Sequence, residues 1–349
     1  MTTPIMPQIA QPTLSVLVAT YQGEAFILEQ LVSLTAQTEL PFEIVVCDDA
    51  SNDETVQRVR QFAQTSVVPV RLFRNPKNKG YARNFFDGIE HCVGDYVAFC
   101  DQDDVWLPHK LSTLRAVITS QPQIGLVYSD CELVDQQLNS LNQTASQYLR
   151  LSKQQCKQIQ QGHLFELLIR KPCVTGMTML VNRHKVMAVD HSFLKMAHDY
   201  ALSFAFAALG DYIYVDQSLV KYRQHTHNVV GMSKKVEAIP PLKPIEQELH
   251  ELNLDLVDKI NLCVYAKKML VQHQPHSFER IATLTHLIDF FTLRIQRRHS
   301  VVAWCQAFPQ VAVRQFKLAE RIGMNIKDLK IFFKLKWFNR LNTKGMNED

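Results

Sequence analysis

Three carboxylates fall within four residues, Asp101, Asp103 and Asp104, directly after an apolar run. Carboxylate oxygens suit Mg²⁺ or Mn²⁺, and these ions commonly complete their coordination shells with phosphate oxygens and water. A solvated loop that caps a helix is the alternative explanation. Because the acids end a core strand, and Trp106 and Pro108 stiffen the turn behind them, we expect a divalent metal here.

A second acidic pair, Asp48 and Asp49, follows another apolar run. A carboxylate at a strand end can accept a hydrogen bond from a pyrimidine ring N–H or from a ribose hydroxyl. The alternative is a turn and helix cap that involves Ser51. Both interpretations hold together if Asp49 faces a ligand while Ser51 caps the helix.

Residues near the other strand ends suit contacts with a nucleotide. Thr20 and Tyr21 leave the first predicted strand, and Gly23 permits a close approach of the backbone. The segment lacks the GxGxxG spacing, which argues against a nicotinamide or flavin dinucleotide. In NPKNKGYARNFF, Lys79 and Arg83 are either neighbours of a phosphate or part of a solvated basic face.

Two residues of the second half suit roles beside a metal–phosphate site. Asp199 opens a strongly apolar helix, where it either interacts with the helix dipole or acts as a general base. His225, in YRQHTHNVVG, is either a surface or core histidine, or a third metal ligand or diphosphate contact.

The elements that must position these residues alternate between strands and helices. Apolar runs predict strands at 14–19, 42–47, 70–73 and 96–100, and helical patterns follow at 24–37, around Val56 and Val59, at 81–91 and after Pro108. Continuously apolar strands in this alternation predict an α/β fold, a mostly parallel sheet with helices on both faces. Ligands bind beyond the carboxyl ends of such strands, so we expect both acidic clusters at one edge.

The second half of the chain predicts fewer strands and more helices. Further strands are expected at 124–129, 178–181 and 212–215, and a Gln-rich loop with a short helix at 136–161. This loop and the segment around Thr175 and Gly176 are expected to set substrate specificity. The predicted divisions are an N-terminal tail at 1–12, a catalytic domain at 13–235 and, beyond a linker with Pro240, Pro241 and Pro244, a C-terminal helical region at 236–349.

The composition excludes several classes of protein. The net charge of +4 on 349 residues is too small for a typical nucleic-acid binder. The eight cysteines are scattered and form no CxxC pair, which favours buried, reduced thiols over zinc or disulfides. The N-terminus shows no signal-peptide pattern and no apolar run spans a membrane, so we expect a cytoplasmic protein.

The motifs in their order along the chain resemble one known family. ATYQGE, FEIVVCDDASNDET, NKGYARNF, FCDQDDVW, HDY and YRQHTHN look like bacterial family 2 glycosyltransferases of the GT-A fold, over residues 13–231. The resemblance implies an inverting transfer from a nucleotide-diphospho-sugar with Mg²⁺ or Mn²⁺. The form of the last two motifs is similar to a subgroup of rhamnosyltransferases of O-antigen or capsule assembly, which implies dTDP-L-rhamnose as a candidate donor. The QxxRW sequence of processive synthases is absent.

The resemblance also implies roles for particular residues. Asp49 would bind the nucleotide base, Asp103 would be the direct metal ligand with His225, Asp101 would contact ribose or metal-bound water, and Asp199 would be the catalytic base. Many relatives have Glu-Asp where this chain has His198-Asp199. The remaining residues expected to bind the nucleotide sugar are Thr20, Tyr21, Glu24, Lys79, Arg83 and Gln102.

The acceptors of capsule and O-antigen enzymes are usually lipid-linked, which implies work at the inner face of the membrane. Residues 321–344 interleave aromatic and basic side chains, as suits an anionic lipid surface; packing on the catalytic domain or a dimer contact is the alternative. Two other functions compete: a sugar-nucleotide-forming nucleotidyltransferase, which usually has a Gly-rich basic loop that ATYQGE lacks, and a non-catalytic module that binds sugar nucleotides.

Overall fold

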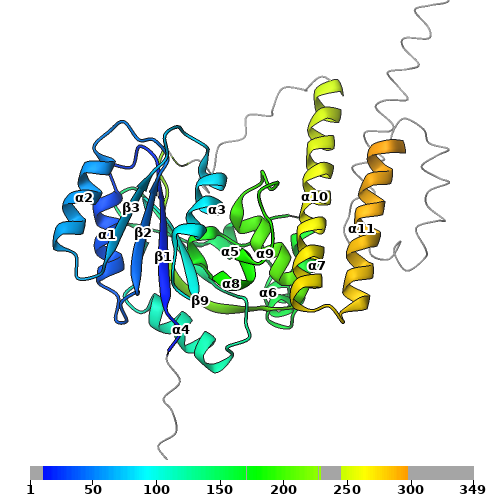
Figure 1. Cartoon of the computed structure of the whole chain (residues 1–349), viewed down its shortest axis with the longest axis horizontal. Coiled ribbons are helices and arrows are strands. Elements are labelled where there is room, and N and C mark those ends of the chain that lie inside the picture. Colours follow the sequence, from blue (N-terminus) through cyan, green and yellow to red (C-terminus); the bar gives the residue numbers. More distant parts are fainter. Residues whose placement is uncertain (1–10, 170, 227, 229–244, 298–349) are drawn as a thin grey trace, which may run out of the picture.

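A computed structural model describes residues 11–169, 171–226, 228 and 245–297 of the chain. Its nine-stranded sheet lies between layers of helices (Figure 1). The strands are β1 Leu14–Thr20, β2 Glu43–Asp48, β3 Val70–Arg74, β4 Tyr96–Asp101, β5 Val105–Trp106, β6 Leu126–Val134, β7 Ser140–Thr144, β8 Met179–Asn182 and β9 Tyr212–Arg223.

Helices separate most of the strands. They are α1 Ile27–Thr35, α2 Thr55–Thr65, α3 Tyr81–His91, α4 Lys110–Ser120, α5 Ala145–Tyr148, α6 Lys153–Gln160, α7 Leu164–Leu168, the 3₁₀ turn η1 Gly176–Thr178, α8 Arg183–Met187, α9 His198–Leu209, α10 Ile245–His273 and α11 Phe278–Arg297. Helix α8 begins directly after β8, and α9 begins after a loop. Helix α9 lies beside η1.

The sheet order is β3-β2-β1-β4-β8-β6-β9-β5, with β7 paired to β6. The first four strands are parallel, as predicted. The second half is mixed, because β8 runs antiparallel to both β4 and β6 while β6 and β9 are parallel. The predicted α/β class is therefore confirmed, and β1 to β4 form its wholly parallel half.

The strands are apolar along their whole length because each face of the sheet is covered. In β1, Val16 and Val18 pack into one core with Ile27 and Leu31 of α1. Leu17 points the other way and packs with residues of α3 and α9. Burial of alternate side chains on both faces gives the unbroken apolar runs that the sequence shows.

Two segments differ from their predicted form. The Gln-rich segment holds β7, α5 and α6, because Gln147 and Gln155 complete capping boxes with Thr144 and Ser152. Strand β9 continues eight residues past the predicted end at Val215, since it pairs with β6 along its length and then with β5. Its middle is polar and exposed, which hid the strand pattern.

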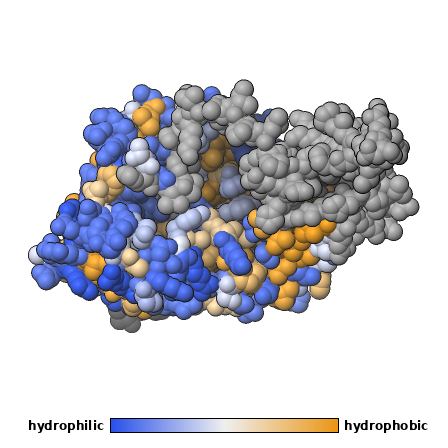
Figure 2. Space-filling model, turned by 90° about the horizontal axis from the view of Figure 1, so that it is seen from above, coloured by the Kyte–Doolittle hydropathy of each residue, from blue (hydrophilic) through white to orange (hydrophobic). Residues whose placement is uncertain are grey.

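The helices α10 and α11 share a hydrophobic core with the sheet and α9, through side chains such as Tyr265, Met269 and Phe291. Figure 2 shows hydrophobic residues gathered near this end of the molecule, whereas the α1–α2 end is mainly hydrophilic. The division at 235 stays a prediction, and the Pro-rich linker and the 321–344 segment lie outside the described residues. Within the described part, no helix is both long and apolar enough to cross a membrane.

Candidate active site

The carboxyl ends of β1, β2 and β4 bring the predicted residues to one edge of the sheet. Thr20 pairs in register with Asp48, and Ala19 pairs with Asp101. The Thr20 hydroxyl donates to Asp48 at 3.1 Å, and the backbone N–H of Asp49 donates to the Thr20 carbonyl at 2.8 Å. Parallel register therefore places both acidic clusters side by side, as the sequence predicts.

Asp103 and His225 form a direct contact at this edge. The Nε2 atom of His225 lies 2.9 Å from Oδ2 of Asp103, and both side chains are largely buried. The His225 ring packs on Phe26 with 4.7 Å between centroids, and Asn228 accepts from the His225 backbone N–H at 2.5 Å. No group of three His, Cys, Asp or Glu side chains in the described residues is arranged to hold a metal ion.

Asp104 points into the protein, away from any ligand. It is fully buried, and one of its oxygens accepts from the Arg223 backbone N–H at 3.1 Å. Its other oxygen has no hydrogen-bond partner among the described residues. Burial and the charges of Asp103 and Asp101 hold the pKa of Asp104 well above its usual range. Of the three clustered acids, Asp101 and Asp103 are thus the two that remain for a ligand.

Asp199 lies in the first turn of α9, with its carboxylate held by two backbone N–H groups. Tyr200 donates to Oδ1 at 2.7 Å, and Gly176 in η1 donates to Oδ2 at 3.2 Å. Burial raises the pKa of Asp199 to about 6, although these hydrogen bonds oppose the shift. A carboxylate with such a pKa is ionised at neutral pH and can still accept a proton.

Asp199 and Asp101 are electrostatic neighbours. Burial raises the pKa of Asp101 to about 7, and the charges of Asp103 and Asp199 add to the rise. The pKa of Tyr81 is also raised, by burial and then by the charges of Asp199 and Asp101. The structure therefore brings the end of β4 and the first turns of α9 and α3 close together.

Asp49 is buried and organises the loop before α3. Its oxygens accept from the backbone N–H of Lys79 at 2.9 and 3.0 Å, from Gly80 at 2.8 Å and from the Asn75 amide at 2.9 Å. These contacts fix the loop 75–80 beside the end of β2. The role of Asp49 toward a nucleotide base stays a prediction.

Lys79 and Arg83 lie on one side of α3 and share a carboxylate. Lys79 Nζ is 2.8 Å and Arg83 Nη2 is 2.5 Å from the two oxygens of Asp87. Both cations are partly exposed. Burial would raise the pKa of Asp87, but the contacts with Lys79 and Arg83 outweigh it and lower the pKa. A phosphate contact by either cation would compete with Asp87.

Gln102 and Glu24 hold the loop that follows β1. The Gln102 amide accepts from the Tyr21 backbone N–H at 2.8 Å and donates to its carbonyl at 3.0 Å. A Cβ on Gly23 would lie 2.1 Å from Gln102 Oε1, so a larger residue there would displace the Gln102 amide. Glu24 accepts from the Glu54 backbone N–H at 2.8 Å, which directs its carboxylate toward α2. The Tyr21 side chain is exposed.

Sequence reasoning missed three buried polar residues of this region. Lys110 is fully buried behind the acidic loop, Arg223 binds the Asp103 carbonyl at 2.7 Å, and His198 is buried beside Asp199. One signal was available for Lys110, since a lysine in the first turn of a helix opposes the helix dipole. The His198 ring contacts Phe85 and Phe99, and its nitrogens have no partner among the described residues.

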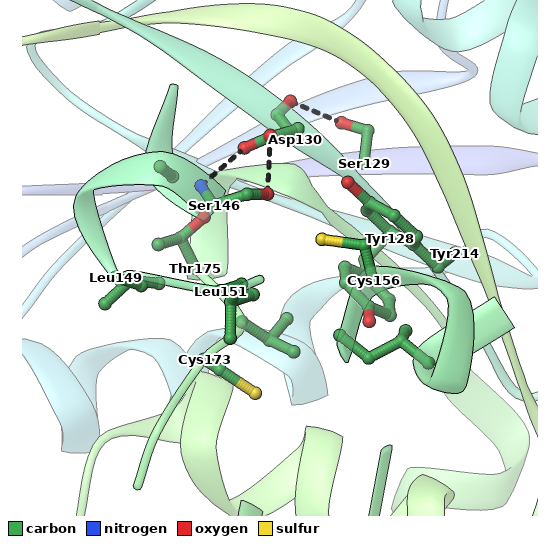
Figure 3. Close-up of a pocket in the computed structure, with 13 residues that line it drawn as sticks. Tyr128, Ser129, Asp130, Ser146, Leu149, Leu151, Cys156, Cys173, Thr175 and Tyr214 are labelled. Atoms are coloured by element: carbon green, nitrogen blue, oxygen red, sulfur yellow. Dashed lines mark hydrogen bonds between the residues drawn. The ribbon is translucent and has the colours of Figure 1, made fainter. Parts of the chain in front are cut away.

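The two segments predicted to set specificity line one cavity (Figure 3). Ser146 and Cys156 come from the Gln-rich segment, and Thr175 precedes the turn that binds Asp199. Asp130 accepts from the Ser146 hydroxyl at 2.6 Å on one wall. The cavity volume is ≈ 20 Å³, which suits a water molecule rather than a sugar.

Comparison with known proteins relates part of this chain to one family. Residues 15–184 match the family model of glycosyl transferase family 2. They form a family 2 glycosyltransferase domain. An uncharacterized glycosyltransferase of Haemophilus influenzae is 34% identical over 125 residues, which cover 35% of this chain and 41% of that protein. An uncharacterized glycosyltransferase of Nostoc is 26% identical over 221 residues, 62% of this chain and 66% of that protein.

One of the proteins similar to this chain has a named activity. The Escherichia coli protein WfgD, a UDP-Glc:α-D-GlcNAc-diphosphoundecaprenol β-1,3-glucosyltransferase, is 28% identical over 121 residues, 35% of this chain and 46% of that protein. The chain thus spans between about two fifths and two thirds of the lengths of these three relatives.

The predicted GT-A fold is confirmed by solved glycosyltransferase structures. The S. aureus TarS fragment in complex with UDP-GlcNAc superposes with a TM-score of 0.53 at 16% identity, covering 95% of this chain and 92% of that chain. The same fragment with UDP gives a TM-score of 0.51 at 17% identity, covering 81% of this chain and 71% of that chain.

Proposed function

We propose that this chain is a metal-dependent, inverting glycosyltransferase that transfers a sugar from a nucleotide-diphospho-sugar to a hydroxyl of a lipid-linked glycan. The observation that carries the proposal is the grouping of Asp101 and Asp103, which lie in the segment that matches family 2, with Asp199, which lies beyond that segment. Asp103 pairs with His225, and the charges of Asp103 and Asp199 both raise the pKa of Asp101.

The spacing of Asp103 and His225 fits a divalent cation. Neighbouring ligands of an octahedral ion with bonds near 2.1 Å lie about 3.0 Å apart, and the two side-chain atoms are 2.9 Å apart. We assign these residues to Mg²⁺ or Mn²⁺, with phosphate oxygens and water as the other ligands. When bound, the cation offsets the negative charge of the departing diphosphate.

Asp199 is the base in this proposal. The acceptor hydroxyl oxygen forms a bond to the anomeric carbon, the bond from that carbon to the diphosphate oxygen breaks, and the electron pair leaves with the diphosphate. The hydroxyl proton passes to Asp199, whose orientation the Gly176 and Tyr200 N–H groups fix. Attack from the face opposite the diphosphate inverts the anomeric configuration, and no covalent intermediate is required.

The nucleotide would lie beyond the ends of β1 and β2. We assign its base to Asp49 with Thr20 and Tyr21 alongside, and its ribose to Asp101. The named activity of WfgD supports a lipid-diphosphate-linked acceptor, and hence work at the cytoplasmic face of a membrane. Donors to test first are UDP-glucose, UDP-GlcNAc and dTDP-L-rhamnose.

A panel of nucleotide sugars with Mn²⁺ tests the proposal. A donor at 100 times its Kd stabilises the folded state by about 2.7 kcal/mol, so the preferred donor raises Tm. Transfer is then measured with that donor and a polyprenyl-diphosphate sugar as the acceptor. Nucleoside triphosphates serve as controls, because a nucleotidyltransferase would be stabilised by them instead. A chain that no nucleotide sugar stabilises would contradict the proposal.

A further inference from the structure

Lys110 is a charged side chain in an unusual place. It begins α4 and has no solvent exposure. Its Nζ atom donates to the Met177 carbonyl oxygen at 2.6 Å and lies 3.0 Å from the centroid of the Trp106 ring. A buried ammonium group is costly unless it makes specific contacts, so the fold retains these contacts for a reason other than packing.

On one side, Lys110 contacts the acidic loop through Trp106. Burial lowers the pKa of Lys110 well below its usual range, and the nearby Asp104 and Asp101 oppose this shift. Asp104 is equally buried and keeps one oxygen without a partner in the described residues. Trp106 continues the same loop and covers the ammonium group.

On the other side, Lys110 holds the η1 turn. Met177 is the middle residue of this turn, and the preceding residue, Gly176, donates its N–H to Asp199 at 3.2 Å. The turn packs closely against α9, since a Cβ on Gly176 would lie 2.6 Å from Nε2 of His198. The position of the Met177 carbonyl thus determines where the Gly176 N–H meets the Asp199 carboxylate.

We propose that Lys110 is a positioning residue that links the acidic loop to the turn that orients Asp199. It keeps the carboxylate of the base at a fixed place relative to Asp101 and Asp103. This inference rests on the proposed function for its consequence in catalysis. The link between the loop and the turn consists of the Lys110 contacts with Met177 and Trp106, and it can be tested without a substrate.

The test compares Lys110→Met with the parent chain by hydrogen–deuterium exchange and by kinetics. Methionine preserves the length and packing of the side chain but cannot donate to Met177. We expect the peptide that contains Gly176 to exchange about 10-fold faster, because each lost hydrogen bond weakens local protection. The amides of Lys79 and Gly80, which bind Asp49, should exchange at the parent rate.

In kinetics with the donor that stabilises the parent chain, we expect kcat to fall about 100-fold while the donor KM changes by less than about 3-fold, because a misplaced base impairs the chemical step. Lys185→Met is the control, since Lys185 also donates to a carbonyl oxygen, that of Gln123 at 2.7 Å, and pairs with Asp211 rather than with the η1 turn. It should lower Tm and leave exchange at Gly176 and kcat unchanged.

A purely stabilising role for Lys110 would make Lys110→Met behave like the control, and that result would overturn the inference. If Lys110→Met does not fold, Lys110→Gln is used, whose amide is too short to reach Met177 without movement of the turn; parent-like exchange at Gly176 would then overturn it. Absence of turnover with every donor in the parent chain counts against the proposed function, while exchange still decides the role of Lys110.

Discussion

The imidazole Nε2 of His225 lies 2.9 Å from Oδ2 of Asp103, although the two residues are 122 positions apart. The pairing of β5 with β9 creates this contact, because Trp106 is in register with Val220. Arg223 strengthens the connection by donating to the Asp103 carbonyl at 2.7 Å. The last strand of the domain is therefore part of the candidate metal site.

Replacing either member of this pair should weaken metal-dependent nucleotide binding. We expect His225→Ala and Asp103→Asn to raise the Kd for UDP with Mn²⁺ by about 10- to 100-fold, the usual effect of removing a group that holds a metal. Isothermal titration with and without Mn²⁺ measures this. His184→Ala is the control, since His184 contacts Asp95 at 3.5 Å on the surface. Equal Kd values for His225→Ala and His184→Ala would disprove the assignment.

Asp199→Asn should abolish transfer while sparing donor binding. The amide cannot accept the acceptor proton, so kcat should fall by about 1,000-fold, within the usual range for general bases. The Kd for the donor should stay within about 3-fold, because catalysis and ground-state binding use different contacts. Asp190→Asn, an exposed carboxylate, is the control. Transfer that survives in Asp199→Asn would instead favour a different base, and loss of donor binding would favour a binding role.

The activity should depend on the ionisation of Asp199. Burial raises its pKa to about 6, and only the ionised form accepts a proton, so kcat/KM should rise with pH and level off above about 6. Asp101, whose pKa is raised to about 7, titrates in a similar range and broadens the rising part of the pH profile. A pH profile of kcat/KM on the parent chain measures this. A flat profile between pH 5 and 7 would speak against Asp199 as the base.

His198 should make folding stability depend on pH. Burial lowers its pKa from 6.5 to about 3 in the folded state, so the unfolded chain binds a proton that the folded chain cannot. Stability is fully present above pH 6.5 and is lost as pH falls toward 3, by about 2 kcal/mol between pH 7 and 5. Urea unfolding at pH 7 and pH 5 measures the fall in the free energy of unfolding. In His198→Leu this fall should be smaller by about 2 kcal/mol. An identical loss in both proteins would refute this explanation.

The elements that carry the site were predictable because burial on both faces leaves a clear pattern. The runs that became β1, β2, β3 and β4 end within one residue of their predicted ends, and α3 has the predicted bounds of Tyr81 and His91. Parallel strands bring their carboxyl ends to one edge, so the proximity of Asp48 and Asp101 followed from order alone. The position of Asp199 beside Asp101 was an implication of the family resemblance.

The contacts within the site were not predictable, because they depend on tertiary geometry. No local pattern shows that Asp87 binds both Lys79 and Arg83, or that Asp49 accepts hydrogen bonds from a loop thirty residues later. Lys110 is fully buried, and the only sequence signal for an unusual role is its place in the first turn of a helix. Such buried polar groups interrupt the hydrophobic pattern on which sequence prediction relies.

The most direct test is an anomalous diffraction map of crystals grown with Mn²⁺ and the nucleoside diphosphate of the preferred donor. We predict a single Mn²⁺ peak bonded to Asp103 and His225 at about 2.1 to 2.2 Å, with diphosphate oxygens on the same ion and Asp199 across the donor site. A diphosphate bound elsewhere, or an ion that contacts neither Asp103 nor His225, would contradict the account.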